Sequence, residues 1–184
     1  MSEEEAASFL WQERTVTCAT QGPRGWPHLM PLWYVLRDAQ PGGSIAVAPE
    51  AGSSASAGEA AEAGEAGTAG PRIWAWTYAV SQKVRNLERD ARATLQVEAG
   101  EQYQELRGLM FECDVRIHRE LGTVAALGNE IFCRYAADRG EPPVAELAPE
   151  VKAMVDKQAA KRVALEFVER RRASWDHRKL GVVY

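Results

Sequence analysis

The sequence is short of the residues that build metal sites and disulfide frameworks. Its 184 residues include three cysteines and three histidines, with no CxxC pair and no histidine at metal-ligand spacing from a cysteine. An odd number of scattered cysteines argues against a disulfide scaffold, and the missing ligand spacing argues against a structural zinc site. We therefore expect Cys18, Cys113 and Cys133 to be reduced thiols. A catalytic thiol would need a base partner, and none is evident in the sequence.

Long apolar runs and an excess of positive charge are also lacking. The longest apolar run, residues 29–36, is far shorter than the ~20 residues that a membrane-spanning helix needs. The first residues, Met1 to Glu5, are acidic where a secretory signal would be basic. The net charge of −4 gives no general attraction to nucleic acid or to an anionic membrane. We expect a cytoplasmic protein that has a small-molecule substrate and neither a nucleic-acid nor a membrane partner.

Several motifs of catalysis and nucleotide binding are missing as well. There is no Walker glycine loop, no GxGxxG and no paired-carboxylate arrangement, and His28, His118 and His177 belong to no recognisable triad or ligand set. No catalytic residue and no metal ligand can be named from the sequence. A protein without its own acid–base set suits cofactor chemistry, in which the protein binds and orients a reactive organic group.

Hydrophobic periodicity predicts a mainly β protein of the α+β class. Hydrophobic residues make up 46% and charged residues 26% of the chain, as in an ordinary globular domain. The pattern lacks the βαβ repetition of a doubly wound sheet, so we expect an antiparallel arrangement. The expected strands are 15–20, 27–36, 72–77, 92–98, 106–118 and 163–168. The expected helices are 80–88, 121–138 and 149–161, and residues 8–14 are expected to be the end of a short helix.

Two residues inside the expected strands suggest irregularities. Pro31 interrupts the second strand, so it must lie at an edge, at a bulge or where the ladder is broken, because proline donates no backbone hydrogen bond. Gly108 predicts a bulge in the fifth strand.

A low-complexity segment separates the second strand from the third. Residues 50–70 are nearly all Ala, Gly, Glu and Ser, which cannot bury enough apolar surface to offset chain entropy. We predict a disordered insertion at about residues 39–71, at the tip of a hairpin, with a short strand at 44–48. Since neither flank could close a core alone, residues 1–184 form one domain.

The most informative stretch runs from Thr77 to Leu87. A strand ends there, a short turn follows, and a helix begins with Ser81 at its cap and Lys83 in its first turn. Unpaired backbone N–H groups, the positive end of the helix dipole, a hydroxyl and an ammonium together suit a phosphate. The helix dipole otherwise disfavours a lysine in this turn. The alternative is a solvated lysine on a surface helix.

Aromatic residues concentrate on the second and third strands, beside the expected phosphate site. They could form a wall against a planar ring system. They could equally belong to the barrel core or to a dimer interface, where tryptophan and tyrosine are favoured. These residues are Trp26, Trp33, Tyr34, Trp74, Trp76 and Tyr78.

Several stretches together resemble a known superfamily. They are residues 9–20, Gly22, Gly25, Trp26-Pro27-His28, residues 32–35, residues 81–90, Arg107-Gly108, residues 161–163 and residues 174–180. In this order they resemble the pyridoxamine 5′-phosphate oxidase-like split-barrel superfamily, and within it the flavin/deazaflavin oxidoreductase B group. The likeness covers most of the chain apart from the low-complexity segment.

The resemblance implies a six-stranded antiparallel split β-barrel with flanking helices, an FMN-binding split barrel. It also implies a homodimer with cofactor clefts at the subunit interface. In such proteins the lysine equivalent to Lys83 contacts the cofactor phosphate. The other residues expected to bind the cofactor are Ser81, Gln82 and Asn86 near the phosphate, and Pro31, Leu32, Trp33 and Thr77 near the ring.

The resemblance further implies an oxidoreductase that uses coenzyme F-420, a deazaflavin, to pass hydride to a small conjugated acceptor. An FMN-binding flavoprotein is the main alternative, because Lys83 would serve either phosphate. A non-catalytic module that carries a cofactor or binds haem is a second alternative, and a pyridoxal-phosphate-forming oxidase is a third. Residues 175–180 could reach the cleft, or could pack on the barrel and stabilise the dimer.

Overall fold

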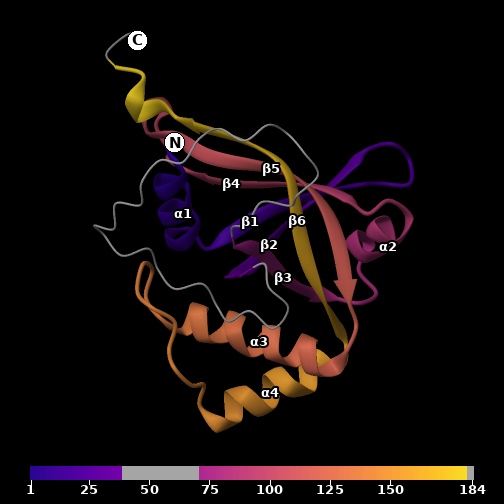
Figure 1. Cartoon of the computed structure of the whole chain (residues 1–184). Coiled ribbons are helices and arrows are strands. Elements are labelled where there is room, and N and C mark those ends of the chain that lie inside the picture. Colours follow the sequence, from indigo (N-terminus) through magenta and orange to yellow (C-terminus); the bar gives the residue numbers. More distant parts are fainter. Residues whose placement is uncertain (39–70, 182–184) are drawn as a thin grey trace.

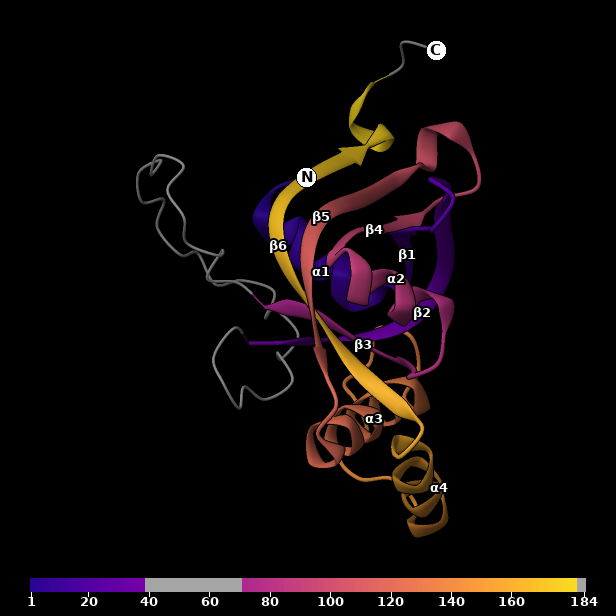
Figure 2. The same cartoon turned by 90° about the vertical axis from the view of Figure 1, so that its right-hand side faces the viewer.

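Six antiparallel strands close into a barrel, with helices at its ends and on one side (Figures 1 and 2). The computed structural model describes residues 1–38 and 71–181, so the predicted strand 44–48 and nearly all of the predicted insertion lie outside the described residues. The strand order around the barrel is β1-β2-β3-β6-β5-β4. The predicted fold class is thus confirmed. The strands are β1 (Thr15–Gln21), β2 (Pro27–Arg37), β3 (Arg72–Tyr78), β4 (Arg92–Ala99), β5 (Arg107–His118) and β6 (Arg162–Asp176).

Four α-helices accompany the barrel in the described part of the chain. They are α1 (Glu3–Gln12), α2 (Gln82–Arg89), α3 (Leu121–Ala136) and α4 (Pro149–Ala159), and two single-turn helices are η1 (Tyr103–Glu105) and η2 (His177–Lys179). The first helix begins at Glu3, where Ser2 and Glu5 form a capping box, and it ends at Gln12, within the stretch predicted to end a helix. None of the described helices is long and apolar enough to cross a membrane.

The barrel interior is filled by its own side chains. Inward-facing residues of alternating strand positions, such as Val16, Leu95 and Leu165, are fully buried. Helices α1 and α2 add Phe9 and Leu87 to the same core. A residual cavity inside the barrel measures only about 20 Å³, the space of about one water molecule. The barrel interior therefore has no room for a ligand larger than a water molecule.

Helices α3 and α4 form a second apolar cluster on the outside of β2, β3 and β6. Leu127 and Ile131 of α3 pack with Val155 of α4 over Trp76. Gly128 permits this close approach, because a Cβ there would lie 2.9 Å from Val155 Cγ1 and 3.0 Å from the Trp76 ring. These helices therefore cover the middle of the outer face of β3, whereas its C-terminal end is exposed to solvent.

Strands β2 and β3 pair over only part of their lengths. Residues 34–37 of β2 pair with residues 72–75 of β3, whereas residues 27–33 of β2 pair with β1 alone. On the N-terminal side of Tyr34 in β2, and on the C-terminal side of Ala75 in β3, the two strands no longer pair. We call this region the split. Pro31 lies in the part of β2 with one neighbouring strand, so the prediction that it marks an edge or a broken ladder is confirmed.

Two strand predictions were wrong. The register shift between β5 and β6 falls between Glu112 and Cys113, where Arg170 of β6 is the extra residue, and not at Gly108. The glycine is needed instead because the Trp175 ring covers it, at 2.2 Å from where a Cβ would stand. The last strand extends from Arg162 to Asp176, well past the predicted 163–168, because β5 provides ladder partners as far as Arg107.

A buried arginine joins α1, β2 and α3. The Arg134 side chain is 3% exposed, and its guanidinium donates to four backbone carbonyls, those of Leu10, Trp11, Glu13 and Tyr34. It also lies over the Tyr34 ring, with Cζ 4.4 Å from the centroid. Buried carbonyls need partners, so this one side chain satisfies the end of α1 and a break in the sheet together.

We predict that Arg134→Met lowers the free energy of unfolding by about 3 kcal/mol, since four buried carbonyls each lose a charged donor. The carbonyls of Leu10 and Glu13 keep only the Tyr34 hydroxyl, and that of Trp11 keeps no donor among the described residues. Chemical denaturation measures the change. Arg85→Met, at an exposed arginine of α2, is the control and should shift stability by less than about 0.5 kcal/mol. Equal small losses in both variants would show that the network does not support the fold.

Candidate functional site

Lys83 is buried at the end of the barrel. Helix α2 begins at Gln82 after the N-cap residue Ser81, so the prediction that Lys83 lies in the first turn is confirmed. The side chain is only 5% exposed, and Nζ donates to Thr77 Oγ1 at 3.1 Å. The alternative of a solvated surface lysine is wrong. Its ammonium group points at β3 from the inner side of the barrel.

No described residue supplies a negative charge to this ammonium. Thr77 is neutral, and Lys83 forms no ion pair within residues 1–38 and 71–181. Cys18 on β1 interacts with Lys83 electrostatically, and burial raises the pKa of that thiol to about 12, so it stays protonated at neutral pH. Burial lowers the pKa of Lys83, with a smaller opposing effect from Cys18. A largely desolvated cation without a counter-ion costs stability unless an anion binds beside it.

Two further polar atoms near α2 lack a hydrogen-bond partner among the described residues. They are Ser81 Oγ and His28 Nδ1, both buried. Ser81 occupies the N-cap position, but its side chain makes no capping bond. His28 pairs with Thr20 across the β1–β2 ladder, and directly paired residues face the same side of a sheet. Thr20 in turn contacts α2, so His28 faces the same barrel end.

Asn86 and Gln82 have partners within the protein. Asn86 is fully buried and donates to Thr20 Oγ1 at 3.0 Å, while Gln82 Nε2 donates to Asn86 Oδ1 at 2.8 Å. These bonds tie α2 to β1. Of the predicted phosphate-site residues, Ser81 and Lys83 are thus the two whose buried polar group lacks a hydrogen-bond partner or a counter-ion among the described residues, and Asn86 positions the helix that carries them.

The predicted ring-site residues Pro31, Leu32 and Trp33 lie on the β2 side of the split. Leu32 is buried in the barrel, Pro31 is exposed, and Trp33 is half-exposed and stacks on Tyr135 with 4.3 Å between ring centroids. The N–H and C=O of Tyr34 bond to α3 side chains on the β1 side. Because backbone groups alternate along a strand, those of Trp33 point toward the split, where no ladder continues.

An open hollow of about 490 Å³ lies elsewhere, on the outer face of β1, β4 and β5. Its charged residues are already neutralised, since Arg92 pairs with Asp90 and Arg170 pairs with Asp114. Because its described charges are paired, this hollow should attract an anionic ligand less strongly than the start of α2, where Lys83 has no counter-ion.

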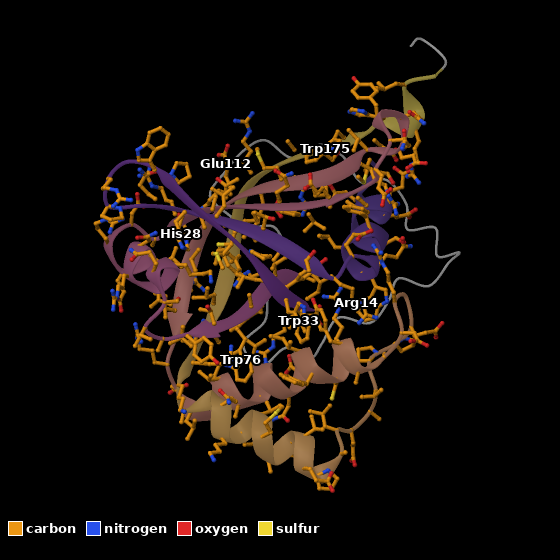
Figure 3. The ribbon with its side chains drawn as sticks, turned by 180° about the vertical axis from the view of Figure 1, so that it is seen from behind. Arg14, His28, Trp33, Trp76, Glu112 and Trp175 are labelled. Atoms are coloured by element: carbon orange, nitrogen blue, oxygen red, sulfur yellow. The ribbon has the colours of Figure 1, made fainter. Side chains whose placement is uncertain are left out.

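Sequence reasoning missed Arg162, whose guanidinium stacks on Trp76 and Tyr78 at the end of β3. Figure 3 shows Trp33 and Trp76 on the same side of the molecule, above α3, and His28 near the β1–β2 hairpin. The sequence marked His28 only as part of Trp26-Pro27-His28 and did not indicate that its Nδ1 is buried. Nothing in the sequence indicates that β6 begins beside Tyr78, so Arg162 could not have been found.

The C-terminal residues pack against β5 and η1. Trp175 covers Gly108, and His177 Nδ1 lies 2.9 Å from the carbonyl oxygen of Tyr103. Arg178 forms an ion pair with Asp176 of β6. These contacts are those of a segment that packs on the barrel, at the end opposite α3 and α4 (Figure 1).

Comparison with known proteins agrees with this fold. Residues 2–164 match the family described as pyridoxamine 5′-phosphate oxidase. A conserved hypothetical protein from Mycobacterium tuberculosis, Rv2991, is 35% identical, with 100% of this chain and 90% of that chain covered and a TM-score of 0.71. None of the curated proteins matches.

Two more distant structures share the fold alone. An F420 reductase is 16% identical, with 94% of this chain and 97% of that chain covered and a TM-score of 0.52. HutZ, the haem storage protein from Vibrio cholerae, is 12% identical, with 95% and 93% covered and a TM-score of 0.53.

We predict that Lys83→Met stabilises the ligand-free protein by about 1 kcal/mol at pH 7, because it replaces a buried unpaired cation by an apolar side chain of similar length. The gain should shrink as the pH rises. The pKa of Lys83 is lowered in the folded state, so the unfolded chain binds more protons between that pKa and 10.5, and the wild type gains stability across this window.

Urea denaturation at pH 7 and pH 10 measures both effects. Arg85→Met, also on α2 but exposed, is the matched control and should show neither of them. Destabilisation by Lys83→Met at pH 7 would instead mean that the Lys83–Thr77 bond supports the fold.

Proposed function

Because the chain belongs to the pyridoxamine 5′-phosphate oxidase family, we propose that it is an oxidoreductase subunit that binds coenzyme F-420. The cofactor binds through its phosphate at the start of α2 and passes hydride to a small conjugated acceptor. One observation carries the proposal: the buried ammonium of Lys83 has no anionic partner among the described residues.

The residues at this barrel end fit a phosphate. Lys83 bonds to one neutral oxygen and has two N–H donors left. Ser81 adds a buried hydroxyl without a partner in the described part of the chain, and α2 adds the unpaired N–H groups of its first turn. An anion here would neutralise the ammonium, satisfy the hydroxyl and meet the positive end of the helix dipole.

The split provides a place for the ring of the cofactor. Pro31 and Trp33 present backbone groups without ladder partners toward it, as the family resemblance implies for ring contact. When bound, a deazaflavin supplies the hydride. The chain's own contribution is to anchor the phosphate at Lys83, to orient the ring along β2, and to hold the acceptor against it.

FMN and haem are the alternatives. FMN carries a phosphate too, so Lys83 alone does not separate it from F-420. HutZ shares this fold and is a haem storage protein. His28 has a buried Nδ1 without a partner, which makes it the one described histidine not already engaged. An absorption spectrum recorded after haem addition tests for haem binding, with His28→Ala as the control. A haem spectrum that depends on His28 would favour haem binding over the proposed oxidoreductase.

We also propose that two copies of the chain associate through the outer face of β1 and β2. Leu29 is 57% exposed and Trp33 48% exposed there, with exposed Pro31 between them. The paired β1 residues, Thr17 and Ala19, are small. A flat apolar face of this kind is typical of a protein–protein interface, and it adjoins the split. A second copy would therefore complete the cleft.

We predict tight binding of F-420 to the stripped protein and weaker binding of FMN, measured by fluorescence titration at fixed salt. Lys83→Met should weaken F-420 binding at least tenfold, because a charge-assisted bond to phosphate is lost. Arg85→Met should leave the affinity unchanged. A preference for FMN would instead identify the protein as an FMN-binding flavoprotein. If the folded protein bound neither cofactor, the proposed function would be refuted.

We predict that Leu29→Asp converts the dimer into a monomer, because a charge would be buried in the interface. Sedimentation velocity measures the state, and the F-420 affinity should fall with it. Leu180→Asp, at a residue 51% exposed beyond η2, is the control and should remain dimeric. A wild type that sediments as a monomer would rule out the proposed association.

A further inference from the structure

Arg162 is held between two aromatic rings at the start of β6. Its Cζ lies 4.2 Å from the centroid of the Trp76 ring and 4.0 Å from that of Tyr78. The β3–β6 register places Arg162 directly opposite Tyr78. Stacking of this kind fixes the plane of a guanidinium and leaves its N–H groups, which lie in that plane, free to bond.

Those N–H groups have no protein partner among the described residues. Arg162 forms no ion pair and no hydrogen bond there, and its Nε is buried without an acceptor. Other partly buried arginines do have acids, as Arg37 has Glu130 and Arg72 has Glu166. A planar, preorganised cation with an unused edge is suited to a carboxylate or phosphate that it can bind with two parallel bonds.

Arg162 and Lys83 lie on opposite sides of the end of β3. Lys83 bonds to Thr77, whose side chain is buried, whereas Arg162 stacks on the next residue, Tyr78, which is half-exposed. Successive residues of a strand face opposite sides, so the two cations flank one point of the chain. That point is where β3 has parted from β2, at the split.

The outer side of this point also has exposed aromatic surface. Tyr78 is 47% and Trp33 48% exposed, and both Trp33 and Trp76 make edge contacts with Phe132 of α3, at 6.2 Å (Figure 3). An anionic group at Arg162 would thus have flat apolar surface beside it. The surroundings suit a planar conjugated molecule that carries an anionic group.

We propose that Arg162 binds the carboxylate of a flat conjugated ligand, and that this ligand is the acceptor of the proposed reaction. Lys83 then serves the cofactor phosphate on the inner side of β3, and Arg162 selects acceptors with a carboxylate on the outer side. The role of the ligand as acceptor rests on the proposed function. The existence of the carboxylate site does not, because it stands on the geometry of Arg162 alone.

The test compares 4-fluorobenzoate with 4-fluorobenzamide, which has nearly the same shape and no charge, in fluorine NMR titrations of the full chain. We expect the wild type to bind the benzoate about tenfold more tightly, the effect of a charge-assisted hydrogen bond. Arg162→Gln should remove this preference and Arg162→Lys should keep part of it, because lysine retains the charge but not the planar fork. Lys161→Gln, at the exposed cation next in the chain, should preserve it fully.

Equal binding of the two probes by the wild type would overturn the proposal, as would an unchanged preference in Arg162→Gln. Circular dichroism checks that the variants are folded. The preference that Arg162→Lys keeps in part shows that a loss in Arg162→Gln is not caused by unfolding. Lys83→Met separates this site from the proposed function: it should lose F-420 and keep the benzoate preference. A protein that fails to bind F-420 but shows the Arg162-dependent preference would refute the proposed function and leave the carboxylate site intact.

Discussion

The buried guanidinium of Arg134 is the interaction on which the arrangement of this protein depends. A barrel strand that leaves its neighbour exposes backbone groups, and a helix that ends against a core exposes carbonyls. Here one side chain of α3 satisfies both, at the end of α1 and at Tyr34 of β2. Tyr135 adds to the same junction by accepting the N–H of Tyr34. The position of α3, and with it the aromatic surface around Trp33 and Trp76, follows from these bonds.

The polar groups at the end of β3 contrast with this fully satisfied network. Lys83 is buried and Arg162 is partly buried, with its Nε shielded from water, yet neither has an acid beside it in the described structure. Buried charge without a partner lowers stability, and proteins retain such features where a ligand supplies the missing partner. Two such cations at one point, beside a broken ladder, are the reason that we propose this point as the functional site.

The fold itself does not choose among functions. Relatives of similar architecture include an F420 reductase and a haem storage protein, and the identities of 16% and 12% carry no site chemistry across. A barrel whose interior is filled leaves only its ends and outer faces for chemistry. The distinction between these functions therefore rests on individual side chains, above all on Lys83, which suits a phosphate, and on His28, whose buried Nδ1 has no partner among the described residues.

Local sequence determined the strands, the helix that follows β3, the role of Pro31 as an edge residue and the place of Lys83 in a first turn. Each of these depends on neighbouring residues, through periodicity, capping and the missing N–H of proline. Only the tertiary structure decided which charges lack partners. The burial of Lys83 beside Cys18, the stacking of Arg162 on Tyr78 and the length of β6 all arise from contacts between strands far apart in the sequence. Burial and pairing are properties of the assembled barrel, because no local pattern records which distant strand will lie alongside.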